Sequence, residues 1–282
     1  MEARYRAAGA GRRPVPARLR HPDLLLAGLV LLVVLAWAAV PALFTGQDPV
    51  QGVPADRLQG PSAAHVFGTD HLGRDLFARV VHGSRLTLQA TVLAVLIGLV
   101  VGTLVGLVAG SLRGVVDDVL MRAVDVLLSI PALLLSMALI TALGFGTVNV
   151  AIAVGLGTVA NFARVMRSEV LKVSTSPYVE AARASGVRTT GVLFRHVLPN
   201  AAGPVLALAA LEFGVAVLAV SALSFLGFGA PPPAPEWGSL VSGGRDYLAT
   251  AWWLTTLPGL VVAAVVLSAN RIAQALENGA TT

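Results

Sequence analysis

The polar stretch Ser176-Pro-Tyr-Val-Glu-Ala-Ala-Arg-Ala-Ser-Gly186, which runs on to His196-Val-Leu-Pro-Asn200, stands between long apolar segments. Ser176 is a residue type that caps helices, and Pro177 fits the first turn of a helix. Gly186 can supply the left-handed residue that ends a helix. Together these signals predict a helix of about three turns.

A second short helix is predicted directly after this corner, from Thr190 to Leu198. We expect it to end at Pro199, because proline cannot donate a backbone hydrogen bond inside a helix. The stretch therefore predicts two short helices that meet at a glycine corner. We call residues 176–199 the protrusion.

The composition of the whole chain is that of a membrane protein. Of its 282 residues 56% are hydrophobic and 12% are charged, with a mean hydropathy of +0.78. A soluble domain carries about twice that share of charged residues. The chain has no cysteine, which excludes disulfides, thiolate nucleophiles and cysteine-ligated metal centres.

Six apolar segments are predicted to span a membrane, so the predicted fold class is an all-α polytopic membrane protein. The predicted spans are 24–44, 86–109, 123–143, 148–163, 204–226 and 255–269. The predicted organisation is a basic arm (1–22), a first span with an external loop (23–85), a five-helix core (86–273) that includes a coupling loop (174–200), and a tail (274–282). Pro131 is expected to kink the third span.

The distribution of basic residues predicts the orientation of the chain. With the amino terminus inside, fifteen of the twenty Lys and Arg residues lie on the cytoplasmic side. This asymmetry agrees with the positive-inside rule and places both termini and the protrusion in the cytoplasm. Because topology explains the net charge of +5, nucleic-acid binding is not expected.

Three separate strings resemble those of one transporter family. Glu180-Ala181-Ala182, Gly186 and Leu198-Pro199 match the spacing of the EAA loop of bacterial ABC-importer permeases. Phe67-Gly-Thr-Asp70-His-Leu-Gly-Arg-Asp75 resembles a signature of the dipeptide/oligopeptide/nickel subtype. The string from Ser224-Phe-Leu-Gly227 to Trp237-Gly238 resembles that subtype as well.

The resemblance implies a permease subunit of an ATP-driven peptide importer in the bacterial cytoplasmic (inner) membrane. It implies three kinds of protein partner besides the lipid bilayer: a homologous second permease subunit, two cytoplasmic ABC ATPase subunits and an external substrate-binding protein. It also implies that this chain binds no cofactor and that ATP and Mg act on the ATPase subunits. The residues that would contact an ATPase are Tyr178, Glu180, Ala181, Ala182, Ala184, Gly186 and Pro199.

The motifs that are missing agree with a transport subunit rather than an enzyme. The chain has no Gly-x4-Gly-Lys-Ser/Thr phosphate loop, and its single lysine, Lys172, follows a leucine. It also has no Gly-x-Ser-x-Gly or His-Glu-x-x-His motif. Any ATP hydrolysis is therefore expected on separate subunits.

A regular glycine spacing in the second span predicts close helix packing. Gly98, Gly102, Gly106 and Gly110 recur every four residues and therefore share one helix face. Small residues at this spacing let the backbone of a neighbouring helix approach closely inside a membrane. We expect this face to contact another helix of the protein.

Two polar residues inside predicted spans are candidates for the translocation path. Glu212 lies in the body of the fifth span, where an acidic residue costs about 2.5–3.5 kcal/mol unless it faces protein or water. Asn161 lies near the end of the fourth span. One interpretation is a polar lining of the path that receives a peptide amine; the alternative is a hydrogen-bonded contact with the partner subunit.

Other polar and aromatic residues have simpler interpretations. Asp70 is expected to cap a short amphipathic helix with Arg74, Arg79 and Arg85 as interfacial anchors, and Asp125 to be a paired interface residue. An interfacial aromatic belt is predicted for Trp237, Tyr247, Trp252 and Trp253. A metal site is the less favoured interpretation of His65, Asp70, His71, Asp75 and His82, which show no metal-binding helix spacing.

Two other functions stay open on the sequence. A permease of the same fold could carry nickel or another small solute, because ligand choice would lie mainly in a binding protein. A secondary transporter is less favoured, since it would need an ion relay and commonly has inverted repeats, whereas this chain has one acid in mid-span.

Overall fold

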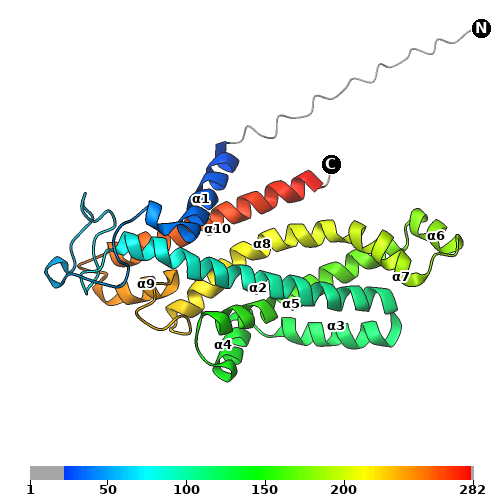
Figure 1. Cartoon of the computed structure of the whole chain (residues 1–282). Helices are drawn as coiled ribbons and strands as arrows, with labels where there is room; N and C mark the ends of the chain where they lie inside the picture. The colour runs from blue at the N-terminus through cyan, green and yellow to red at the C-terminus, as the bar shows by residue number, and fades with distance from the viewer. Residues whose placement is uncertain (1–21, 281–282) are drawn as a thin grey trace, which may run out of the picture.

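The computed structural model describes residues 22–280, with side chains up to residue 276, and these residues form helices and loops without a strand (Figure 1). The helices are α1 (Pro22–Ala39), α2 (Leu76–Leu112), α3 (Gly114–Ser129), α4 (Ala132–Leu143), α5 (Thr147–Ser174), α6 (Pro177–Ala184), α7 (Thr189–Val192), α8 (Leu198–Phe225), α9 (Trp237–Gly244) and α10 (Trp253–Ala280). Five helices are long and apolar enough to cross a membrane, or six spans if the bent pair α3–α4 counts as one. The predicted all-α polytopic fold is therefore confirmed, with five or six spans for the six predicted. The predicted basic arm lies outside the described residues, apart from Pro22.

Helices α2, α3, α5 and α8 run roughly along one axis, whereas α1 and α4 lie across it, and the loops gather in two groups at the two ends (Figure 1). The loop between α1 and α2 and the short helix α9 lie at one end of the molecule. Helices α6 and α7 extend from the opposite end. An ion pair from Arg271 Nε to Asp23 Oδ2 links the start of α1 to the later part of α10, so these two segments lie side by side.

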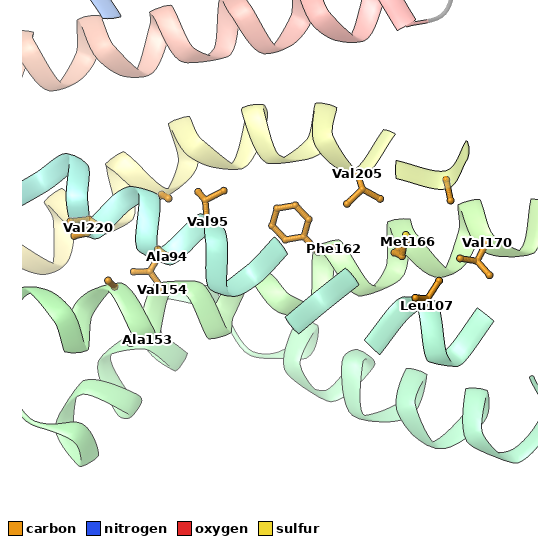
Figure 2. Packing of buried hydrophobic residues seen from close by; sticks show 14 of the residues in the cluster. Ala94, Val95, Leu107, Ala153, Val154, Phe162, Met166, Val170, Val205 and Val220 are labelled. Atoms are coloured by element: carbon orange, nitrogen blue, oxygen red, sulfur yellow. The ribbon is translucent and has the colours of Figure 1, made fainter. Parts of the chain in front are cut away.

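The main hydrophobic core lies between α2, α5 and α8. Phe162 and Met166 of α5 are fully buried, and Figure 2 shows Phe162 with Val95 of α2 and Val205 of α8 on either side of it. A second cluster joins α1, α2 and α10 around Trp237. Both clusters are built from residues of different spans, so the helices form one packed unit.

Glycines of α2 line its contact with α5. A Cβ added at Gly102 would lie 2.5 Å from Phe162 Cβ and 2.6 Å from the Val159 carbonyl oxygen. Gly98 faces Thr158, and Gly106 faces the Ala163 carbonyl, in the same manner. The two backbones approach so closely that a side chain larger than hydrogen would have to separate the helices.

The predicted third span is two helices rather than one kinked helix. Helix α3 begins at Gly114, nine residues before the predicted start, and α4 follows it at an angle of 97°. The break falls at Ile130-Pro131, because the ring of a proline removes a donor and clashes with the preceding turn. Pro131 correctly predicted where the helix is interrupted, but not that the two helices would meet at so large an angle.

Two predicted helix starts were wrong. Helix α2 is continuous from Leu76, so the predicted separate amphipathic helix is its first part. Its cap is Asp75, whose carboxylate accepts from the Ala78 amide at 2.7 Å, and not Asp70. Helix α8 begins at Leu198 rather than near Pro204, and it runs through that proline.

The aromatic belt was wrong for two of its members. Trp237 is fully buried, and its indole Nε1 donates to the Val80 carbonyl at 3.0 Å. Trp253 is 8% exposed and donates to the Thr69 carbonyl at 3.3 Å. The two buried indoles hold together the end of the molecule that carries the α1–α2 loop and α9, which we call the loop end. Trp252, in contrast, is exposed as a membrane anchor would be.

Candidate functional site

Helix α6 is eight residues long and forms the tip of the protrusion. It has about two turns, not three. Pro177 occupies its first turn as predicted, but Ser176 does not cap it with its side chain; the Ser176 hydroxyl donates to the Val173 carbonyl at 2.6 Å instead. This hydrogen bond links the last turn of α5 to the residue that precedes α6.

The carboxyl end of α6 is closed by a glycine corner. Gly186 has φ +79°, a conformation that side chains disfavour. The Gly186 amide donates to the Arg183 carbonyl at 3.0 Å, and the Val187 amide donates to the Ala182 carbonyl at 3.2 Å. These two bonds form a Schellman motif, which reverses the chain into α7.

One face of α6 is buried and the other is exposed. Val179 is completely buried in the main core, and Ala182 packs against it. The exposed residues of this helix include most of the residues predicted to contact a partner, namely Tyr178, Glu180, Ala181 and Ala184. The helix therefore presents a short exposed face of alanines with one tyrosine, one acidic side chain and one basic side chain, Arg183.

The second half of the protrusion is also anchored by valines. Val192 and Val197 are buried in the core, whereas Phe194 between them is 61% exposed. Residues Leu193–Val197 form a π-helical segment, and Pro199 lies in the first turn of α8 with an exposed side chain. The predicted stop at Pro199 was wrong, since the wider π turn leads directly into α8.

Two ion pairs join α3 to α5 near the base of the protrusion. Arg167 donates to both carboxylate oxygens of Asp117 at 2.6 Å, and Asp117 is buried. Arg164 donates to Asp125 at 2.8 Å, but both of these side chains are exposed. The bidentate buried pair is the stronger link.

The two candidate path residues lie together in space although 51 positions separate them. Asn161 Nδ2 of α5 donates to Glu212 Oε1 of α8 at 2.8 Å. Glu212 is 6% exposed, and its Oε2 has no hydrogen-bond partner among the described residues. Asn161 is exposed, so this polar pair lies at a surface of the bundle between α5 and α8.

A polar network organises the loop end of the molecule. Asp70 accepts from Arg74 Nε at 2.7 Å and from the amides of Leu72 and Arg74 at 2.8 and 3.0 Å. Arg74 and Arg79 are both buried, which contradicts their predicted role as interfacial anchors. Among the described residues, no group of three His, Asp or Glu side chains is placed to hold a metal ion.

Glu236 is a buried residue that the sequence analysis missed. It is completely buried, and its Oε2 accepts from the Ser224 hydroxyl and the Ala230 amide, each at 2.8 Å. It thereby holds the proline-rich loop against the end of α8. Its position next to Trp237, after a run of prolines, was the available signal, because an acid in such a loop needs donors nearby.

The bundle of long apolar helices, with a short helix extending at one end, defines the class of the protein as an integral membrane protein of the transporter type. Residues 102–281 match the family described as "Binding-protein-dependent transport system inner membrane component". The chain belongs to this family.

Relatives agree with this assignment over nearly the full chain. A dipeptide transport system permease protein DppC from Alkalihalophilus pseudofirmus is 37% identical over 262 residues, which cover 93% of this chain and 86% of the relative. A glutathione transport system permease protein GsiD from Pectobacterium atrosepticum is 36% identical over 261 residues, 92% of this chain and 87% of the relative.

Two solved transporter structures share the fold over about 70% of this chain. The MetNI methionine ABC transporter in an inward-facing conformation matches with a TM-score of 0.56 at 21% identity, over 71% of this chain and 97% of that one. An amino acid ABC transporter matches with a TM-score of 0.56 at 18% identity, over 70% of this chain and 92% of that one. At these identities the likeness concerns the fold.

Proposed function

We propose that this chain is one permease subunit of an ATP-driven importer for peptides, and that its protrusion is the docking site for an ATPase subunit. The names of the relatives, which transport dipeptides or glutathione, support a peptide as the cargo. The exposed face of α6 carries the docking proposal, because its alanines allow a partner to approach closely and Glu180 and Arg183 offer it one charge of each sign.

The protrusion faces the cytoplasm in this proposal, and both termini lie on the same side. ATP and Mg would be bound by two ATPase subunits, and an external binding protein would deliver the cargo to this chain and a homologous second permease. The buried Val179 connects the exposed face of α6 to the core between α2, α5 and α8. When the two ATPase subunits close on each other, the contact between α6 and its ATPase subunit would pass this motion to the long helices, which would switch between two arrangements.

The translocation path in this proposal passes the Asn161–Glu212 pair. Glu212 Oε2 is buried and lacks a partner among the described residues, so it can accept a hydrogen bond from an ammonium or amide once the helices around it move apart. The neighbouring Asn161 amide holds the other oxygen in place. The exposed Asn161 thus marks the position of a fixed acceptor that lies just inside the bundle.

The docking proposal is tested by affinity purification of the tagged chain in mild detergent, with mass spectrometry of the co-purifying proteins. Glu180→Lys reverses the charge on the exposed face of α6, and Asp246→Lys reverses an equally exposed acid at the opposite end of the molecule. We expect ATPase subunits with the native chain and with Asp246→Lys, and their loss with Glu180→Lys. Equal recovery from both variants would contradict docking through α6.

The cargo is tested separately by uptake of a labelled tripeptide into cells that have or lack the gene. Uptake that depends on the gene supports the peptide proposal. Uptake that is unchanged by its loss, in a strain without other peptide importers, would contradict it.

A further inference from the structure

A large cavity opens at the loop end of the molecule, opposite the protrusion. Its volume is about 960 Å³, which is within the range of small-molecule sites. The proline-rich segment 231–233 and Phe145 form an apolar part of its lining. Polar side chains of the lining include His71, Arg74, Arg79, Ser239 and Ser242.

A smaller cavity of about 60 Å³ adjoins it. The two linings share His71, Arg74, Arg79, Ser239 and Gly243, so the small cavity is a recess of the same site. The rest of its wall is Asp70 and a mostly apolar set, namely Leu76, Leu240, Gly244 and Leu254. The geometry is thus a roomy chamber with a narrow polar recess at the two arginines.

The recess carries an excess of positive charge. Arg74 and Arg79 share a single carboxylate, Asp70, which already accepts three hydrogen bonds from Arg74 and from the loop backbone. Arg79 Nε lies 3.8 Å from Asp70 Oδ2, too far for a hydrogen bond. One guanidinium is therefore only partly compensated.

The guanidinium of Arg79 is held in place by one hydrogen bond, but another of its donors has no acceptor among the described residues. Its Nη1 donates to the Pro49 carbonyl at 2.6 Å, and its side chain is 7% exposed. Its Nε has no hydrogen-bond partner among the described residues. A buried guanidinium donor without an acceptor is costly, and a carboxylate is the acceptor whose geometry suits it.

We propose that this chamber is an entry site that binds the carboxylate of a peptide, with Arg79 as the recognising residue and Arg74 beside it. This inference rests on the proposed peptide cargo and adds a chemical group and a place to it. The chamber is large enough for a short peptide, and the recess is narrow enough to admit only its terminal group. The site would orient the peptide with its carboxylate toward α9 and the start of α2.

The test compares two probes that differ in one group. N-acetyl-Ala-Ala has a free carboxylate, and N-acetyl-Ala-Ala amide does not; neither has a free amine. Dissociation constants are measured by calorimetry on the purified full-length chain, at constant ionic strength. We expect the carboxylate to bind at least about tenfold more tightly than the amide, as one charge-assisted hydrogen bond provides.

Variants assign the preference to the recess. Arg79→Gln should bring the ratio of the two dissociation constants to about one, since it removes one charge-assisted hydrogen bond. Arg245→Gln removes the same charge from an exposed arginine at the same end, outside both cavities, and should leave the ratio unchanged. If Arg79→Gln does not fold, Arg79→Lys keeps the charge without the planar fork and should lower the ratio only in part.

The native chain alone can overturn the proposal. Equal binding of the two probes would mean that the arginines only hold the loop, whatever the outcome of the uptake experiment. Inorganic phosphate is the third probe, and tighter binding of phosphate than of N-acetyl-Ala-Ala would assign the recess to a free anion or a lipid headgroup. A preserved carboxylate preference in Arg79→Gln would equally exclude Arg79 as the recognising residue.

Discussion

Replacement of Gly186 by valine is the sharpest test of the coupling role of the protrusion. Gly186 has φ +79°, and a Cβ added there would meet no atom within 4 Å. The substitution therefore creates no clash and acts only through the backbone. A side chain in the left-handed region costs about 1–2 kcal/mol, and a β-branched one such as valine is a clear outlier there.

The cost falls on a helix that has little stability of its own. An isolated helix of eight residues is not stable in water, so α6 depends on the burial of Val179 and on its closing Schellman bonds. Escape from the strained conformation breaks the bonds from Gly186 to Arg183 and from Val187 to Ala182, each worth about 1 kcal/mol. A loss of about 1–2 kcal/mol reduces the ratio of ordered to disordered corner by about 5- to 30-fold.

We expect Gly186→Val to lower peptide uptake severalfold at an unchanged level of membrane-inserted protein, while ATP hydrolysis by the assembled importer continues. The assay is uptake and ATPase rate measured on the same reconstituted preparation. Gly186→Asn is the matched control, because asparagine tolerates the left-handed conformation and should retain coupling. Normal uptake in Gly186→Val would refute the argument that this corner transmits the motion.

Further predictions concern the bundle and the path. Gly102→Ala should lower the free energy of unfolding by about 1–3 kcal/mol through overpacking, whereas Gly203→Ala, which meets no atom within 4 Å, should be neutral or stabilising in thermal unfolding. Asp117→Asn should cost about 1–3 kcal/mol because it breaks the bidentate pair to α5, and Asp125→Asn less than about 1 kcal/mol; similar losses for both would contradict the ranking. Glu212→Gln should reduce uptake without lowering the melting temperature, and unchanged uptake would leave this residue a packing contact.

The features of the fold that could be predicted from the sequence were those that depend on local composition and spacing. Long apolar runs predicted the five long spanning helices, since a bilayer requires such runs whatever the packing, but not that the third predicted span is two helices. The glycine spacing 98–102–106 identified a face that the structure places against α5. These signals are local in sequence, which is why they could be read without the structure.

The errors came from features that depend on three-dimensional neighbours. Pro199 looked like a helix stop, but a π-helical turn before it allows α8 to start there. Trp237 was interpreted as a membrane anchor, yet it is buried and donates a hydrogen bond to the carbonyl of Val80, which lies 157 positions away in the sequence. Periodicity carries no information on contacts between such distant residues.

The candidate sites were predictable to different degrees. Glu212 and Asn161 were selected one by one as polar residues in spans, but only the structure joins them by a hydrogen bond. Arg79 was expected at the membrane interface and is instead buried at the recess of a cavity. A single arginine in a helical sequence does not indicate whether a neighbouring loop will fold over it.

The central claim, that the exposed face of α6 contacts an ATPase subunit, is tested most directly by cross-linking. The native chain has no cysteine, so Ala181→Cys places a single thiol on this face. Ala249→Cys places one on an exposed alanine at the opposite end as a control. We predict that a thiol-reactive photo-cross-linker joins position 181, but not position 249, to an ATPase subunit in native membranes. No adduct from position 181, or equal adducts from both positions, would contradict the account.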